Sequence, residues 1–237
     1  MAERVDVVFV DGGVRTPFGR AGEKGMYWNT RADDLVVKAI TGLLERNPNL
    51  PKDRVDEVAI AATTQQGDQG LTLGRTAAIL AGLPMTVPGY AIERMCAGAM
   101  TAVTTTGSGI GFGQYDIVIA GGVEHMGHHP MGQGADPNPR FLAEKLVDPQ
   151  ALNMGNTAER LHDRFPQLTK ERADRFGMRT SRRSRPPTSR PHPARPRARG
   201  HSHGRGWGGL ATEDEGRRPE TTMEGLAALK TPFRPHG

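Results

Sequence analysis

The stretch VPGYAIERMCAGAM (residues 87–100) joins a strand-like run to a helix of small residues, and Cys96 stands at the junction. A cysteine at a helix N-terminus is favoured as the thiolate, because the partial positive charge of the helix end stabilises the anion. The thiolate is the form that attacks a carbonyl carbon. A lone cysteine is, however, also a common inert residue of protein cores. The stretch alone therefore leaves two interpretations of Cys96 open: a nucleophile or a core residue.

Strands and helices alternate on both sides of this junction. β-branched runs bounded by turn residues predict strands, and apolar residues at helical spacing predict helices. Thr30 is expected to cap the first helix. The expected elements are strands at residues 5–10, 55–62, 88–95 and 115–120, and helices at residues 30–46, 73–83 and from 96 onward. This alternation predicts an α/β fold with a largely parallel or mixed sheet, in which ligands bind at strand ends. Cys96 and the pair Gly121-Gly122 both follow such ends.

The sequence changes character after residue 123. It becomes rich in Gly, Pro and His, and helices are predicted only near residues 156–165 and 223–229. We therefore expect two domains: an α/β core over residues 1–123 and an inserted loop domain over residues 124–237.

An arginine-rich stretch, residues 179–207, interrupts the loop domain. It holds nine Arg and no acidic residue, and without it the chain has 22 basic against 26 acidic residues, so it contributes the whole of the net charge of +5. Such a composition cannot bury enough apolar surface to offset its ordering entropy, and we expect it to be disordered. Its arginines predict at most salt-sensitive, non-specific binding to nucleic acid.

The cysteine and histidine residues indicate the cellular compartment and whether a metal site is expected. A single cysteine excludes an intramolecular disulfide and suits a reducing, cytoplasmic compartment. The sequence contains no apolar run of about 18 residues, so no membrane span is predicted. His125, His128 and His129 are spaced as metal ligands could be, but metal sites generally need a third or fourth ligand, and nothing nearby is arranged to supply it. We expect polar loop residues near the substrate pocket there and no metal.

Five motifs together resemble the thiolase family, specifically the acetyl-CoA acetyltransferase and 3-ketoacyl-CoA thiolase group. The resemblance covers about residues 5–178 and again about residues 207–237. The motifs lie at residues 10–19, 92–99, 120–126, 153–159 and 229–237. The resemblance implies the N-terminal α/β domain of a thiolase, with a mixed sheet and helices, and an inserted CoA-binding loop domain.

The resemblance also implies an activity, that of an acyl-CoA C-acyltransferase of fatty acid β-oxidation. It implies that Cys96 is the nucleophile that accepts the acyl group from a 3-ketoacyl-CoA, after which a second CoA cleaves the acyl-enzyme. The reverse reaction is a Claisen condensation. It further implies that Met154 lines the substrate site, that CoA and acyl-CoA are substrates with no cofactor besides them, and that a full-length chain forms homo-oligomers.

The sequence also departs from the thiolase pattern. In the family, a C-terminal twin domain supplies further catalytic loops and a second cysteine, and neither occurs up to Gly237. A catalytically incompetent, truncated thiolase is therefore an alternative to the active enzyme. The abrupt loss and return of family-like sequence around residues 179–207 also suggests the hypothesis of a stretch translated out of register.

Overall fold

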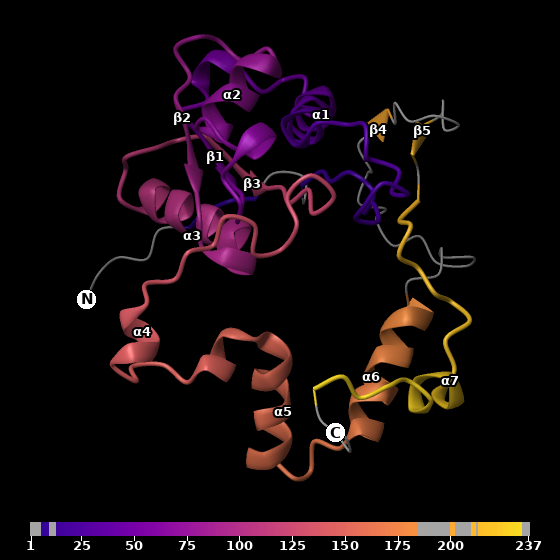
Figure 1. Cartoon of the computed structure of the whole chain (residues 1–237). Helices are drawn as coiled ribbons and strands as arrows, with labels where there is room; N and C mark the ends of the chain where they lie inside the picture. Colours follow the sequence, from indigo (N-terminus) through magenta and orange to yellow (C-terminus); the bar gives the residue numbers. More distant parts are fainter. Residues whose placement is uncertain (1–5, 10–12, 184–199, 202–209, 212, 234–237) are drawn as a thin grey trace. The chain divides into compact units, whose positions relative to one another are not determined.

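The computed structural model describes residues 6–9, 13–183, 200–201, 210–211 and 213–233, and these form two compact units (Figure 1). The first unit contains the described residues up to Gln133 together with those between 200 and 216. The second contains residues 134–183 and 217–233. The first unit thus extends past residue 123, the expected boundary, and the chain returns to it before ending in the second.

A parallel three-stranded sheet forms the centre of the first unit. Its strands are β1 (Glu57–Ala61), β2 (Gly89–Ile92) and β3 (Val118–Gly122), in the order β2-β1-β3. Both pairings are parallel, with Val58 opposite Gly89 and Glu57 opposite Val118. Parallel strands need crossover connections, which the intervening helices supply. The predicted α/β class is therefore confirmed.

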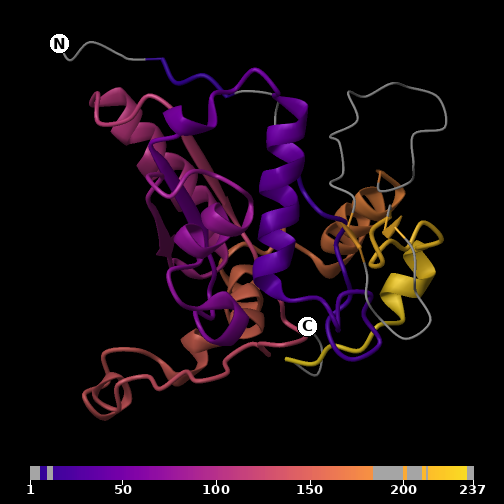
Figure 2. The same cartoon turned by 90° about the horizontal axis from the view of Figure 1, so that it is seen from above.

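Helices cover both faces of this sheet: α1 (Ala32–Arg46) and α2 (Leu73–Leu80) lie on one face, and α3 (Gly98–Gly111) lies on the other (Figure 1). Figure 2 shows α1, in violet, along its length. The apolar sides of α1 and α2 meet β1 in the core. The larger side chains of this core are Val36, Ile40, Leu44, Val58, Ile60, Leu73 and Leu83.

Two glycines let helices approach the sheet closely. A Cβ atom at Gly74 of α2 would lie 2.2 Å from the carbonyl oxygen of Tyr90 and 2.4 Å from that of Val58. On the opposite face, a Cβ atom at Gly98 would lie 2.9 Å from the Cβ atom of Ala61. Both positions require glycine because larger residues would push the helix off the strands.

Short elements complete the first unit. They are the 3-10 helices η1 (Lys52–Arg54), η2 (Gly67–Gln69) and η3 (Met95–Ala97), and an antiparallel pair of β4 (Gly200–His201) with β5 (Leu210–Ala211). The second unit is helical. It contains α4 (Arg140–Ala143), η4 (Pro149–Leu152), α5 (Met154–Arg164), α6 (Lys170–Arg183) and α7 (Met223–Ala227).

The opening strand is the main error of the sequence prediction. Residues 6–9 have no regular secondary structure, and the side chains of Val8 and Phe9 are 81% and 71% exposed. A strand is stable only when its backbone N–H and C=O groups find a partner strand. These residues have strand composition but no partner in the described part of the chain, so composition alone was misleading.

The start of α1 also differs from the prediction. Thr30 does not cap the helix; Arg31 occupies the N-cap position, and its own side chain makes no capping hydrogen bond. The Ala32 N–H instead donates to Oδ2 of Asp68, at 2.8 Å. The helix is thus capped by a carboxylate that lies far away in the sequence, which local pattern cannot reveal.

The arginine-rich stretch is only partly described. Residues 179–183, expected to be disordered, form the last part of α6, and Gly200 and His201 form β4. Residues 184–199 and 202–209 lie outside the described residues. The predictions of disorder and of nucleic-acid binding for those residues therefore stay predictions. No helix in the described part of the chain is long and apolar enough to cross a membrane.

Candidate active site

Cys96 lies just beyond the carboxyl end of β2, where the strand passes through η3 into α3. The carboxyl ends of β1 and β3 are close by, because the Ala62 N–H donates to the Ile92 carbonyl and the Val123 N–H donates to the Ala61 carbonyl. A Cβ atom at Gly122 would lie 3.0 Å from the Cβ atom of Ala99. The predicted gathering of Cys96 and the Gly121-Gly122 pair at one edge of the sheet is thus present.

The backbone before Cys96 is strained. Met95 has a φ of +47°, a value that residues with a side chain rarely adopt. The carboxylate of Glu93 accepts a hydrogen bond of 2.6 Å from the Met95 N–H, and the Ala97 N–H donates to the Arg94 carbonyl at 3.1 Å. These two bonds hold a turn that costs about 1–3 kcal/mol in a free chain.

Cys96 itself is exposed, as are Met95 and Met100. In the described chain the Cys96 thiol is therefore accessible from outside rather than packed in the core of the first unit. Cys96 lies just before the N-terminus of the 14-residue helix α3. That position is suited to a nucleophile because the partial positive charge of a helix end stabilises a thiolate.

Four residues form a largely buried polar network, which we call the histidine clamp: Asp68 of η2 and His125, His128 and His129 of the loop after β3. Of these, His128 is the most accessible, with a side chain that is 25% exposed. Asp68 Oδ2 lies 2.8 Å from His128 Nδ1, and Asp68 Oδ1 lies 2.6 Å from His129 Nε2. The rings of His125 and His128 stack at 3.8 Å between centroids. The three histidines stand out in the sequence, whereas Asp68 does not.

The histidine clamp sets the ionisation of Asp68. Burial alone would raise the pKa of this carboxyl group. The hydrogen bonds from Ala32, His129 and His128 outweigh burial, and the pKa of Asp68 falls well below its usual range. Asp68 is therefore an anion at neutral pH. The sequence signal that could have found it is its polar, Gly-rich surroundings (residues 65–70) shortly after a buried strand.

A second ionic contact joins distant parts of the first unit. The guanidinium of Arg15 donates to both carboxylate oxygens of Asp214, at 2.8 and 3.1 Å, and the Phe18 N–H donates to the same carboxylate at 2.9 Å. Glu215 accepts from the Arg20 and Met26 N–H groups at 2.6 and 3.1 Å. Residues 214 and 215 thus fix the loop that carries the first motif, a role that sequence analysis missed.

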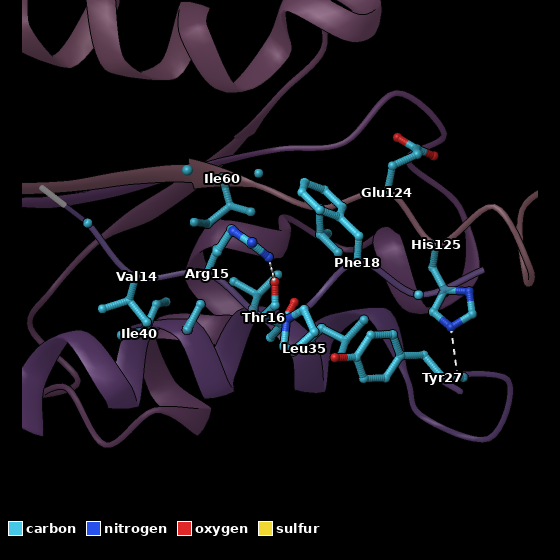
Figure 3. Close-up of a pocket in the computed structure, with 18 of the residues that line it drawn as sticks. Val14, Arg15, Thr16, Phe18, Tyr27, Leu35, Ile40, Ile60, Glu124 and His125 are labelled. Carbon is cyan, nitrogen blue, oxygen red and sulfur yellow. Dashed lines mark hydrogen bonds between the residues drawn. The ribbon is translucent and has the colours of Figure 1, made fainter. Parts of the chain in front are cut away.

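This loop, α1 and the carboxyl end of β3 line a half-open cavity of about 530 Å³ (Figure 3). Leu35, Ile40 and Ile60 form apolar parts of its wall, whereas Arg15 and Tyr27 give it polar groups. Burial raises the pKa of the Tyr27 hydroxyl to about 12, so this group is neutral at physiological pH. Cys96 is not among the residues that line the cavity.

The second predicted site residue, Met154, belongs to the second unit. It is the first residue of α5 and its side chain is 65% exposed. Asn153 caps this helix by accepting a hydrogen bond of 2.9 Å from the Gly155 N–H. A Cβ atom at Gly155 would lie 2.1 Å from the Phe233 ring, so Phe233 packs directly against the motif at 153–159 in this unit.

Comparison with known proteins agrees with these motifs. The family described as "Thiolase, N-terminal domain" matches residues 7–237. The chain is 41% identical to a 3-ketoacyl-CoA thiolase of Saccharophagus degradans over 233 residues, which is 98% of this chain and 58% of the relative. It is 39% identical to a 3-ketoacyl-CoA thiolase of Idiomarina loihiensis over 232 residues, which is 97% of this chain and 58% of the relative. The chain thus spans little more than half the length of these relatives.

The family match extends far beyond the residues around Cys96. It runs from the loop of Arg15 through the Cys96 turn to the segment that ends at Gly237, and so includes both units. The chain belongs to the thiolase family.

Proposed function

We propose that this chain carries the nucleophile of an acyl-CoA C-acyltransferase that cleaves 3-ketoacyl-CoA. The observation that carries the proposal is the exposed thiol of Cys96 on a strained turn between a parallel strand and a helix N-terminus. The names of the relatives, 3-ketoacyl-CoA thiolase, supply the substrate class.

The reaction follows from the chemistry of the thiolate. The Cys96 sulfur attacks the 3-keto carbon, the bond between C2 and C3 breaks, and acetyl-CoA leaves after its C2 carbanion takes up a proton. The thiol of a second CoA then attacks the acyl-Cys96 thioester and gives a shortened acyl-CoA and the free thiol. Such covalent catalysis needs a base and donors for the developing oxyanions. The family resemblance assigns a second cysteine and further catalytic loops to the C-terminal twin domain, so we expect full turnover to need that domain. The first acyl transfer can use the N-terminus of α3 and the Cys96 N–H as part of one oxyanion site.

Met154 is proposed to contact the bound acyl-CoA. An exposed, unbranched side chain at the start of α5 can adapt to an apolar ligand. If its contact is equal in the bound substrate and in the transition state, Met154→Ala raises KM and leaves kcat unchanged. We further propose that the enzyme acts in fatty acid β-oxidation in the cytoplasm and works as a homo-oligomer.

The first test is acyl transfer to the 237-residue chain. After incubation with acetoacetyl-CoA, intact-protein mass spectrometry should show one acetyl group on the wild-type chain and none on the Cys96→Ser variant. A chain that neither gains this group nor reacts rapidly with iodoacetamide would contradict the role of Cys96.

A thiolysis assay on the same samples separates the two candidate functions. Acetylation followed by turnover with added CoA supports the complete enzyme. Acetylation without turnover supports the alternative, a thiolase-family chain that lacks catalytic competence by itself. The exposed thiol favours the first step in both cases, because the attacking atom is accessible.

A further inference from the structure

The histidine clamp ties together three segments of the first unit. They are the loop before α1, which contributes the carbonyl groups of Tyr27 and Trp28, the η2 turn with Asp68, and the loop after β3 with its three histidines. The last two segments follow the carboxyl ends of β1 and β3. None of these groups takes part in the proposed acyl transfer.

Both ring nitrogens of His128 face hydrogen-bond acceptors. Nδ1 lies 2.8 Å from Asp68 Oδ2, and Nε2 lies 2.6 Å from the carbonyl oxygen of Trp28. A carbonyl oxygen only accepts, and an ionised carboxylate only accepts. Each nitrogen must therefore donate a proton, and only the imidazolium form has a proton on both.

The two neighbouring rings need only one proton each. His125 Nε2 lies 2.9 Å from the Tyr27 carbonyl oxygen, to which it can donate, while its Nδ1 accepts a bond of 3.1 Å from the His128 N–H, so one proton satisfies both nitrogens of this ring. His129 Nε2 donates to Asp68 Oδ1 at 2.6 Å, and its buried Nδ1 has no partner among the described residues. A second proton on His129 would place an N–H without an acceptor in the interior, which is costly.

We propose that His128 is the one doubly protonated histidine of the clamp in the folded chain at neutral pH, and that loss of its proton loosens the tie between the three segments. The other charged and titratable groups around it come from every neighbouring segment: Asp68 from η2, His125, His129 and Glu124 from its own loop, and Arg31 with Asp33 from the start of α1. Among them, Asp68 is the anion in contact with the ring.

The charge balance supports this assignment. Asp68 is buried, with a side chain that is 8% exposed, and it accepts bonds from the Ala32 N–H, His128 and His129. Of these donors only His128 has acceptors that demand a second proton. The resulting cation offsets the buried carboxylate and stacks on the neutral ring of His125. A neutral His128 would leave either Asp68 or the Trp28 carbonyl facing a lone pair.

The proposal links folding to pH with a defined sign. An unfolded histidine is mostly neutral at pH 7.5, because its pKa is about 6.5. If the folded chain keeps a second proton on His128, unfolding releases that proton, and the free energy of unfolding falls as pH rises. One such proton lowers the folding equilibrium constant by up to about tenfold per pH unit.

The direct test is nuclear magnetic resonance of the full chain labelled with ¹⁵N-histidine at pH 7.5. We expect one ring, assigned to His128 through its bonded neighbours, to show protonated chemical shifts at both nitrogens, with the rings of His125 and His129 singly protonated. A neutral His128 ring in the folded chain would overturn the proposal, and this readout does not require any variant to fold.

Variants supply an independent test. The folding equilibrium constant is measured by urea unfolding between pH 6.5 and 8.5 for the wild type, His128→Gln and the matched control His129→Gln. In the wild type we expect the folding equilibrium constant to fall by up to about tenfold per pH unit. In the His128→Gln chain this pH dependence should be absent. The control should be less stable but keep the wild-type pH dependence. Equal slopes for the wild type and His128→Gln would contradict the proposal.

Discussion

Single residues decide how firmly the loops at the carboxyl edge of the sheet are held. Asp68 is the clearest case, because one buried carboxylate caps α1 through the Ala32 N–H and accepts from two histidines. Glu93 acts similarly on a smaller scale, since it holds the Met95 N–H in the strained turn before Cys96. Asp68 thus accepts hydrogen bonds from backbone and ring donors in a largely buried site, and Glu93 accepts one from a backbone donor in a strained turn.

Replacing Asp68 tests this role. Asp68→Asn removes a buried anion from its partners, and we expect a loss of about 3 kcal/mol in the free energy of unfolding, measured with urea at pH 7. Asp116→Asn is the control, because its side chain is 80% exposed and should change stability by less than about 0.5 kcal/mol. Similar small losses in both variants would contradict a structural role for Asp68.

The lowered pKa of Asp68 gives the same residue a pH signature. The carboxylate is stabilised in the folded chain, so its contribution is fully present above the ordinary aspartate pKa of about 4. It is lost as pH falls below that value toward the lower folded-state pKa. Acid unfolding should therefore be less steep in Asp68→Asn than in the wild type between about pH 4 and pH 2, as followed by circular dichroism.

At the scale of the elements, close approach of helices to strands fixes the first unit. The α2 backbone at Gly74 lies directly over the carbonyl groups of Val58 and Tyr90, and α3 approaches β1 at Gly98. Backbone atoms cannot rotate away as a flexible side chain can. Any side chain at Gly74 must therefore displace the helix or the sheet.

Gly74→Ala should destabilise the chain by about 3 kcal/mol or more because its Cβ atom would overlap two carbonyl oxygens. Gly107→Ala in α3 is the matched control: its Cβ atom would meet only Val7, at an ordinary 3.9 Å. The control should gain about 0.5–1 kcal/mol from higher helix propensity. Thermal unfolding of both variants measures the difference, and a stabilised Gly74→Ala chain would show that α2 does not pack as described.

At the scale of the whole molecule, the chain leaves the first unit after Gln133 and returns to it before residue 217. The returning residues Asp214 and Glu215 hold the loop of Arg15 through five hydrogen bonds to their carboxylates. The first motif near the N-terminus therefore depends on residues that follow the arginine-rich stretch.

Asp214→Asn should release the loop of residues 15–26 and lower stability by about 2 kcal/mol, since three donors lose a charged acceptor. Hydrogen exchange read by mass spectrometry should show faster exchange at residues 15–26, with little change in β1. Unchanged exchange in that loop would mean that the Arg15–Asp214 contact does not hold it.

Local sequence patterns were enough to predict the α/β alternation, the strand–helix junction at Cys96 and the family motifs. These features are local, because hydrophobic period, β-branched content and turn residues act within a few residues. Local patterns do not mark the exact ends of helices and strands, and these ends differ from the prediction by a few residues. For example, the helix predicted at residues 73–83 stops at Leu80. The chain then turns through Gly82, whose φ is +78°.

The features that join distant segments became visible only in the folded chain. Within the described part of the chain, residues 6–9 have no partner strand, Asp68 rather than Thr30 caps α1, and Asp214 lies against Arg15. In the same way, the three histidines, whose role the sequence left open, form a network around the Asp68 carboxylate. Each of these depends on groups separated by tens of residues or more, and no local pattern states which donor meets which acceptor once the chain is folded.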